Sequence, residues 1–131
     1  MDIRAAGGIV LDADGRLLLV QRGRPPAEGS WSIPGGKCRI GEPAAETCAR
    51  ELAEETGLTV EIERLAGRVH RAAPGGDRFV IDDFVCRVVA GDLLAGDDAV
   101  AAGWFSYREL AGLALVDGLL EALGEWGLLP R

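Results

Sequence analysis

The chain has 131 residues, of which 48% are hydrophobic and 27% are charged, a composition typical of a globular domain rather than a disordered segment. Its 14 basic and 21 acidic residues give a net charge near −7, which disfavours a nucleic-acid polymer or an anionic membrane as the main partner. Because no signal-peptide pattern, long apolar run or zinc-type set of cysteines and histidines is present, we expect one reduced, soluble, cytoplasmic domain over residues 1–131.

The first part of the chain predicts two strands and a loop. Residues 3–11 are apolar and β-prone, and residues 12–15 (DADG) form a turn signal. Residues 16–22 have the pattern of a returning strand, so the chain is expected to open with a hairpin. A loop rich in Pro and Gly follows over residues 23–36.

The clearest helix is predicted between Pro43 and Gly57. Proline suits the first helical position, and glycine suits the left-handed residue just past the end of a helix. The residues between them are mostly good helix formers. Four apolar residues recur at spacings of three and four and predict the stripe that packs on a sheet: Ala45, Ala49, Leu52 and Ala53.

The second half of the chain alternates strands and loops before a final helix. The expected elements are a strand over residues 60–71 bulged at Gly67, a loop over 72–77, a strand over 78–90, an acidic loop over 91–102, a short strand over 102–105 and a helix over 115–126. Strands and two helices in this order predict an α/β (α+β) sandwich, with a mixed sheet packed between helices.

The first predicted helix carries an unusual concentration of negative charge. Residues 42–55 hold five glutamates and a single basic residue, Arg50. On a helix, Glu51, Glu54 and Glu55 fall in one arc, at spacings where like charges repel. A hard divalent cation such as Mg²⁺ or Mn²⁺ would relieve that repulsion, because oxygen ligands suit it. The alternative is a solvated acidic helix face.

From Gly36 to Leu58 the chain has Gly, five residues, Glu42, seven residues, Arg-Glu-Leu, one residue, Glu-Glu, one residue and Gly-Leu. At every specified position this pattern resembles the box of the Nudix hydrolases. The preceding segment 31–37 (WSIPGGK) is also similar to the usual lead-in of that family. The resemblance implies a Nudix-type fold, in which a loop–helix–loop segment holds divalent metal against a diphosphate.

The resemblance also implies roles for single residues. Either Glu54 or Glu51 would be the general base, Arg50 would orient a neighbouring glutamate, and Glu42 would brace the entry to the loop. The implied ligands of Mg²⁺ or Mn²⁺ are the backbone carbonyl of Gly35 and the carboxylates of Glu51, Glu54, Glu55 and Asp98.

Asp98 lies outside the box, six residues before Trp104. This placement resembles the extra acidic ligand of the small triphosphatase branch of the family, and Asp97 is the neighbouring candidate. A solvated turn over residues 96–98 is the alternative interpretation.

Several polar or aromatic residues are candidates for substrate contact. Arg71 and Arg78 flank a loop that contains Pro74, and Trp31 would either stack near the substrate or brace its own loop. Asp82 and Asp83 are adjacent within one predicted strand, so that one of them must face away from the core. The expected substrate-binding residues are Trp31, Arg71, Arg78 and Asp83.

Pro74 lies sixteen residues past Leu58, resembling the downstream proline of ADP-ribose pyrophosphatases. We therefore expect hydrolysis of a diphosphate linkage in a nucleoside diphosphate derivative, with ADP-ribose as the leading candidate. One alternative is a house-cleaning (deoxy)nucleoside triphosphate pyrophosphohydrolase, which the compact chain and the position of Asp98 favour. Another is a non-catalytic nucleotide-binding module, which the complete set of box glutamates disfavours. The expected partner is a small nucleotide, and a homodimer is compatible with the sequence.

Overall fold

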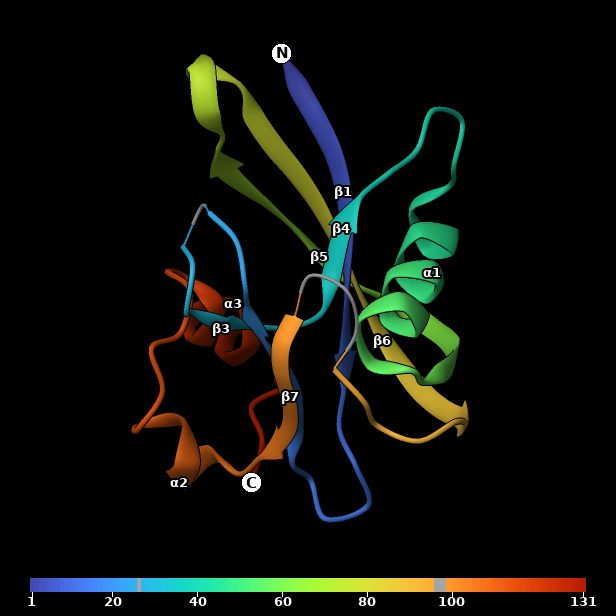
Figure 1. The fold of residues 1–131 in the computed structure, drawn as a ribbon, viewed down its shortest axis with the longest axis vertical. Coiled ribbons are helices and arrows are strands. Elements are labelled where there is room, and N and C mark those ends of the chain that lie inside the picture. The colour runs from blue at the N-terminus through green and yellow to red at the C-terminus, as the bar shows by residue number, and fades with distance from the viewer. Residues whose placement is uncertain (26, 96–98) are drawn as a thin grey trace.

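The computed structural model describes residues 1–25, 27–95 and 99–131. Figure 1 shows two β-sheets, with α1 beside one sheet and the later helices beside the other. The elements in chain order are β1 (Asp2–Val10), β2 (Leu17–Arg22), β3 (Trp31–Ser32), β4 (Gly35–Lys37), α1 (Ala44–Thr56), β5 (Thr59–Ala72), the 3₁₀ turn η1 (Pro74–Gly76), β6 (Arg78–Ala90), β7 (Ala99–Phe105), α2 (Tyr107–Leu110) and α3 (Leu119–Glu125).

The larger sheet has four strands in the order β4-β1-β6-β5, and the smaller has three in the order β3-β2-β7. Strands β1 and β6 are parallel, whereas the other paired strands of the larger sheet are antiparallel. The predicted α+β sandwich with a mixed sheet is therefore confirmed. One buried cluster lies between α1 and the larger sheet, and a second lies where the two sheets and α3 meet.

The predicted opening hairpin is wrong. β1 and β2 meet only at an isolated bridge between Leu11 and Leu17, and they then enter different sheets. Both edges of β1 are occupied, by β4 and by β6, so that no edge remains for β2. Each strand contains a continuous buried apolar run, residues 5–10 in β1 and 17–20 in β2, and such runs do not indicate which neighbour a strand will pair with.

Three other boundaries differ from those predicted. The loop expected over residues 23–36 contains β3 and the start of β4. The strand expected from residue 102 begins at Ala99, because β7 pairs along the full length of β2. The short helix α2 was not expected, although Ser106 and Glu109 form a capping box at its start.

The last helix is shorter than the predicted range 115–126. Leu115 is held in a bridge to Trp31, and the backbone N–H of Val116 donates a hydrogen bond to the Trp31 carbonyl. Gly118 then takes a positive φ of 83° as the residue before α3. These contacts with β3 hold residues 115 and 116 outside the helix, and a turn at residues 117–118 follows, which a helical spacing of leucines cannot reveal.

The structure confirms the first helix and changes its buried face. α1 follows Pro43 and ends at Gly57, which has a φ of 74° and donates a backbone hydrogen bond to Ala53. Of the predicted stripe, only Leu52 is buried, and Ala53 is exposed. The buried side chains of the helix are Thr47, Cys48, Leu52 and Thr56. The helix is therefore rotated slightly, so that Cys48 and Leu52 rather than the alanines contact the sheet.

The two long strands agree with the sequence. β6 has the predicted bounds, and β5 has a register shift between Leu65 and Gly67, which confirms the bulge. A Cβ at Gly67 would lie 2.5 Å from the ring of Trp126, so only glycine allows the indole to pack there. Among the described residues, the structure contains no helix that is both long and apolar enough to cross a membrane.

Candidate active site

The position of α1 depends on a glycine in β1. A Cβ at Gly8 would come within 2.7 Å of Leu52 Cδ1 and 3.1 Å of Cys48 Sγ, so this glycine lets the helix approach the sheet closely. Cys48 Sγ also donates a hydrogen bond to the Gly7 carbonyl. With Cys48 and Leu52 directed into the core, the glutamates of the helix lie away from it.

Arg50 connects the acidic residues of this segment. Its Nε and Nη2 donate to Glu42 at 2.8 and 2.9 Å, and its Nη1 donates to Glu51 at 2.8 Å and to Glu54 at 3.3 Å. Nη2 also donates to the backbone carbonyl of Lys37 at 3.1 Å. One guanidinium therefore binds the loop, the helix and β4, using the fork of donors that arginine provides.

These hydrogen bonds fix the charge states of Arg50 and Glu42. The bonds from Arg50, from the Arg39 backbone N–H and from the Thr47 hydroxyl hold the pKa of Glu42 far below its usual value. The bonds to Glu42, Glu51 and Glu54 raise the pKa of Arg50. Glu42 thus remains a carboxylate that ties the loop before α1 to the helix.

The remaining carboxylates lie beside β4. Glu55 Oε2 accepts a hydrogen bond of 2.9 Å from the backbone N–H of Gly35. A Cβ at Gly36 would come within 2.5 Å of the Glu51 carboxyl carbon, so the glycine leaves the space that this group occupies. Glu54 is more exposed, and Arg39 Nη2 lies 3.6 Å from its Oε1. The sequence analysis missed Arg39, although it follows the lead-in and stands beside the run of glutamates.

The donor set on this face of α1 fits a hard divalent cation. Glu51, Glu54 and Glu55 offer only carboxylate oxygens, which suit Mg²⁺ or Mn²⁺. Within the described parts of the chain, no three such side chains already converge on one point, because Arg50 and the Gly35 N–H engage them instead. The fourth predicted carboxylate, Asp98, lies outside the described residues.

Two of the four predicted substrate residues, Arg78 and Trp31, have structural partners other than the glutamates of α1. Arg78 donates two hydrogen bonds to Asp2, of 3.2 and 3.1 Å, at the exposed start of β6. This end of the molecule also carries η1 and the N-terminus (Figure 1). Trp31 packs edge-on against Phe105 with ring centroids 5.0 Å apart, and it holds the 114–116 segment by backbone hydrogen bonds.

The other two candidates lie on the larger sheet. Arg71, near the end of β5, donates from Nη1 to the His70 carbonyl, and its Nη2 would lie 2.7 Å from a Cβ at Gly118. Asp83, in the middle of β6, is buried. Burial raises the pKa of Asp83 to about 7, the positive charge of Arg71 opposes this shift, and Asp82 adds to it.

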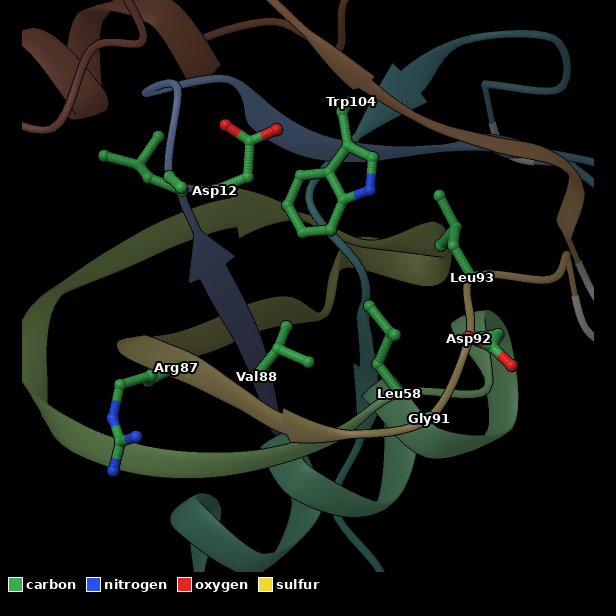
Figure 2. A pocket seen from close by; sticks show the side chains of 10 residues that line it. Asp12, Leu58, Arg87, Val88, Gly91, Asp92, Leu93 and Trp104 are labelled. Carbon is green, nitrogen blue, oxygen red and sulfur yellow. The ribbon is translucent and has the colours of Figure 1, made fainter.

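A cavity of about 420 Å³ lies apart from the glutamates, between the two sheets. Figure 2 shows the indole of Trp104 in this cavity, near Val88, Leu58 and Leu93. Asp12, on its rim, already accepts hydrogen bonds from Arg16. Of the predicted site residues that the structure describes, none lines the cavity.

Comparison with known proteins places the chain in a family. The NUDIX domain model matches residues 1–123. An ADP-ribose pyrophosphatase of Methanocaldococcus jannaschii is 34% identical over 108 residues, which are 80% of this chain and 63% of that protein. The 8-oxo-dGDP phosphatase of Homo sapiens is 34% identical over 106 residues, which are 78% of this chain and 32% of that protein. The alignments thus span less than two thirds of either relative.

Solved structures agree with the sequence comparison. The crystal structure of a MutT NUDIX hydrolase from Burkholderia pseudomallei superimposes with a TM-score of 0.84 at 28% identity, covering 95% of this chain and 97% of that one. The NUDIX model covers nearly the whole chain, including the acidic helix and the strands that position it. This chain therefore belongs to the Nudix hydrolase family.

Proposed function

We propose that this protein hydrolyses the diphosphate linkage of a nucleoside diphosphate derivative, with ADP-ribose as its substrate and Mg²⁺ or Mn²⁺ as its cofactor. The observation that carries the proposal is the acidic face of α1, where Arg50 holds Glu51 and Glu54 and the backbone N–H of Gly35 holds Glu55. The name of the M. jannaschii relative supports ADP-ribose.

The residues on and beside the acidic face of α1 have two roles in addition to proton transfer. Glu51, Glu54, Glu55 and the Gly35 carbonyl would hold the metal, with Asp98 as a further ligand. When bound, the metal neutralises phosphate charge and lowers the pKa of a water molecule. Arg50 orients the carboxylates, since its Nη1 donates to both Glu51 and Glu54. Arg50 is therefore a positioning residue.

The reaction consumes one water molecule. The water oxygen forms a bond to one phosphorus, and the bond from that phosphorus to the bridging oxygen breaks. The carboxylate of Glu54 or Glu51 accepts the proton of the water. From ADP-ribose, the products are AMP and ribose 5-phosphate.

The proposed binding partner is a small nucleotide. The chain could also pair with a second copy of itself, and the proposed location is the cytoplasm. The three cysteines are free in the structure, as a reducing compartment would keep them. The net charge of −7 disfavours polymeric anions.

The experiment that tests the proposal is cleavage of ADP-ribose with and without divalent metal. AMP release should stop when a chelator is added and return with excess Mg²⁺ or Mn²⁺, because the clustered carboxylates need a cation to engage a diphosphate. Full activity in excess chelator would contradict the mechanism. Binding of nucleotide without hydrolysis under any metal condition would instead indicate the non-catalytic module.

A second candidate function is hydrolysis of oxidised or canonical nucleoside di- or triphosphates. The name of the human relative favours it, at the same 34% identity as the archaeal protein. The same acidic face of α1 would perform the same chemistry on these substrates. The two candidates differ in the group attached to the diphosphate.

A further inference from the structure

The proposed reaction assigns no role to Arg39, which lies beside the acidic face of α1. Its backbone is fixed there by Glu42. The Arg39 N–H donates to Oε1 of Glu42 at 3.0 Å, and the Arg39 carbonyl accepts a hydrogen bond of 3.0 Å from the N–H of Glu42. Glu42 is bound in turn to Arg50. The main chain of Arg39 therefore belongs to the same hydrogen-bonded unit as the glutamates of the helix.

The side chain of Arg39, in contrast, is held loosely. It is 68% exposed, and its Nη2 lies 3.6 Å from Oε1 of Glu54, which is longer than a hydrogen bond. The side chain of Arg50 is only 18% exposed, and it donates to Glu42 and Glu51 at 2.8 Å. Because an exposed ion pair contributes little free energy, the Arg39 guanidinium can leave Glu54 at small cost, whereas Arg50 is fixed by its partners.

Glu54 is also one of the proposed metal ligands, so Arg39 and a metal ion compete for the same carboxylate. A carboxylate that is shared by a divalent cation and a guanidinium brings two positive groups together, and these repel each other. We therefore expect Arg39 to leave Glu54 when this carboxylate holds metal. The hydrogen bonds between the backbone of Arg39 and Glu42 keep the released guanidinium close to the glutamates, because only the side chain has to move.

A diphosphate bound at this face of α1 requires positive charge beyond that of the metal. The charge of Arg50 is balanced by Glu42, and the three glutamates proposed as ligands contribute three negative charges, of which one divalent cation leaves one uncompensated. A diphosphate oxygen that binds the same cation becomes a neighbour of these carboxylates. Arginine binds phosphate oxygens with two parallel N–H donors. The released side chain of Arg39 is therefore suited to bind the diphosphate.

We propose that Arg39 is a substrate-binding residue that exchanges partners: it pairs with Glu54 in the metal-free protein and binds a phosphate oxygen of the substrate once Glu54 holds metal. This inference rests on the proposed function, and it applies to both candidate substrates because each contains a diphosphate. The exchange predicts effects of opposite sign, since loss of Arg39 should strengthen metal binding and weaken diphosphate binding. A purely structural role would weaken both or change neither.

The test measures two dissociation constants for the wild type and for Arg39→Gln. The first is that of Mn²⁺ without nucleotide, from the electron paramagnetic resonance signal of the free ion. The second, by calorimetry at saturating Mn²⁺, is that of the α,β-methylene analogues of ADP and dGDP, whose carbon bridge water does not cleave. Arg39→Gln should bind Mn²⁺ about two- to fivefold more tightly, as the loss of an exposed ion pair implies. It should bind the analogues about tenfold more weakly, as the loss of charge-assisted hydrogen bonds implies.

Two further variants separate charge, geometry and position. Arg39→Lys keeps the charge without the two parallel donors, so its Mn²⁺ constant should stay within about twofold of the wild type and its loss of analogue binding should be smaller. The matched control is Arg87→Gln, because Arg87 is another exposed arginine, paired with the exposed Glu61 between β5 and β6. This variant makes the same change in net charge, and both constants should stay within about twofold of the wild type. Thermal unfolding of each variant shows that it folds.

The outcomes for the two proposals are separable. Unchanged or weaker Mn²⁺ binding by a folded Arg39→Gln protein would show that Arg39 does not compete for Glu54, and unchanged binding of the analogues would show that it does not bind the diphosphate. Either result overturns the exchange, as does a wild type that binds neither analogue. A lack of AMP release from ADP-ribose contradicts the proposed substrate instead, and it leaves both dissociation constants measurable because neither depends on cleavage.

Discussion

Single side chains account for the coexistence of so many carboxylates on one helix. Arg50 donates to Glu42, Glu51 and Glu54, so that each of these glutamates has a positive partner in the absence of metal. Glu55 is bound instead to the backbone N–H of Gly35. The repulsion that the sequence pattern suggests is therefore already reduced by hydrogen bonds within the protein.

Replacing Glu54 or Glu55 with Gln should lower kcat for ADP-ribose by several orders of magnitude, because an amide neither accepts a proton nor holds a cation as a carboxylate does. Stability should change by no more than about 0.5 kcal/mol for Glu54→Gln, since surface ion pairs contribute little. Steady-state kinetics and urea unfolding check the two effects. Wild-type kcat in either variant would show that the residue has been assigned the wrong role.

The pKa of Asp83 predicts a pH-dependent difference in stability. Burial raises this pKa from 3.8 to about 7, so between these values the folded state binds a proton that the unfolded state has lost. The free energy of unfolding of the wild type should therefore fall as pH rises through this window, and level off above about 7.

Asp83→Asn cannot ionise and should avoid that loss. Its stability relative to the wild type should increase by up to about 4 kcal/mol between pH 4 and pH 8. Urea unfolding of both proteins at several pH values measures the difference, in which the other titrating groups largely cancel. Parallel stability curves would mean that Asp83 is not desolvated as the structure indicates.

The sequence pattern identified the box glutamates but did not show that Asp83 is buried, and the reason is physical. A complete motif fixes residue types and spacings, and a helix converts those spacings into one face. Asp82 and Asp83 are the same residue type side by side. Only the pairing of β6 with β5 places Asp82 against Arg68, and only its pairing with β1 places Asp83 against Gly7. The Gly7–Gly8 pair was the one available signal of this packing, since a side chain approaches the strand closely at each glycine: Asp83 at Gly7 and Leu52 at Gly8.

At the scale of elements, the contact between α1 and β1 positions the glutamates of the helix. Gly8→Ala would place a Cβ 2.7 Å from Leu52 and 3.1 Å from Cys48, two side chains that are fully buried. Overpacking of this kind costs about 1–3 kcal/mol, so we expect a loss of that size in the free energy of unfolding.

The control for this prediction is Gly112→Ala. The nearest atom to its Cβ would be 3.7 Å away, an ordinary contact, and the backbone there is not left-handed. Its stability should lie within about 0.5 kcal/mol of the wild type. Urea unfolding of both variants decides the matter, and equal stabilities would show that α1 can move without cost.

Element types were predictable, whereas element partners were not. Local sequence signals specify local structure. The bounds of α1 follow from Pro43 and Gly57, and those of β6 from the unbroken strand character of residues 78–90. β1 and β2 enter different sheets because each pairs with strands distant from the turn between them. β1 lies between β4 and β6, and β2 lies between β3 and β7. The extended segment before α3 likewise depends on Trp31, more than eighty residues earlier in the sequence.

At the scale of the whole molecule, substrate choice depends on regions outside the box. The turn after β5 was the basis for expecting ADP-ribose, and in the structure Pro74, Gly75 and Gly76 are exposed, with open space around both glycines. Arg78 beside this turn is engaged by Asp2. The turn thus has room for a distal group, while Arg71 and Asp83 lie closer along the sheet to the glutamates.

We predict that ADP-ribose is cleaved with a higher kcat/KM than any common (deoxy)nucleoside triphosphate. The rigid proline and the two exposed glycines leave space for a second sugar beyond the diphosphate, and a triphosphate would not use that space. The measurement is kcat/KM for ADP-ribose and for the common triphosphates, 8-oxo-dGTP included, under one metal concentration. A tenfold advantage of any triphosphate, which corresponds to about 1.4 kcal/mol of transition-state preference, would contradict this prediction. It would assign the same acidic face of α1 to the hydrolysis of nucleoside triphosphates instead.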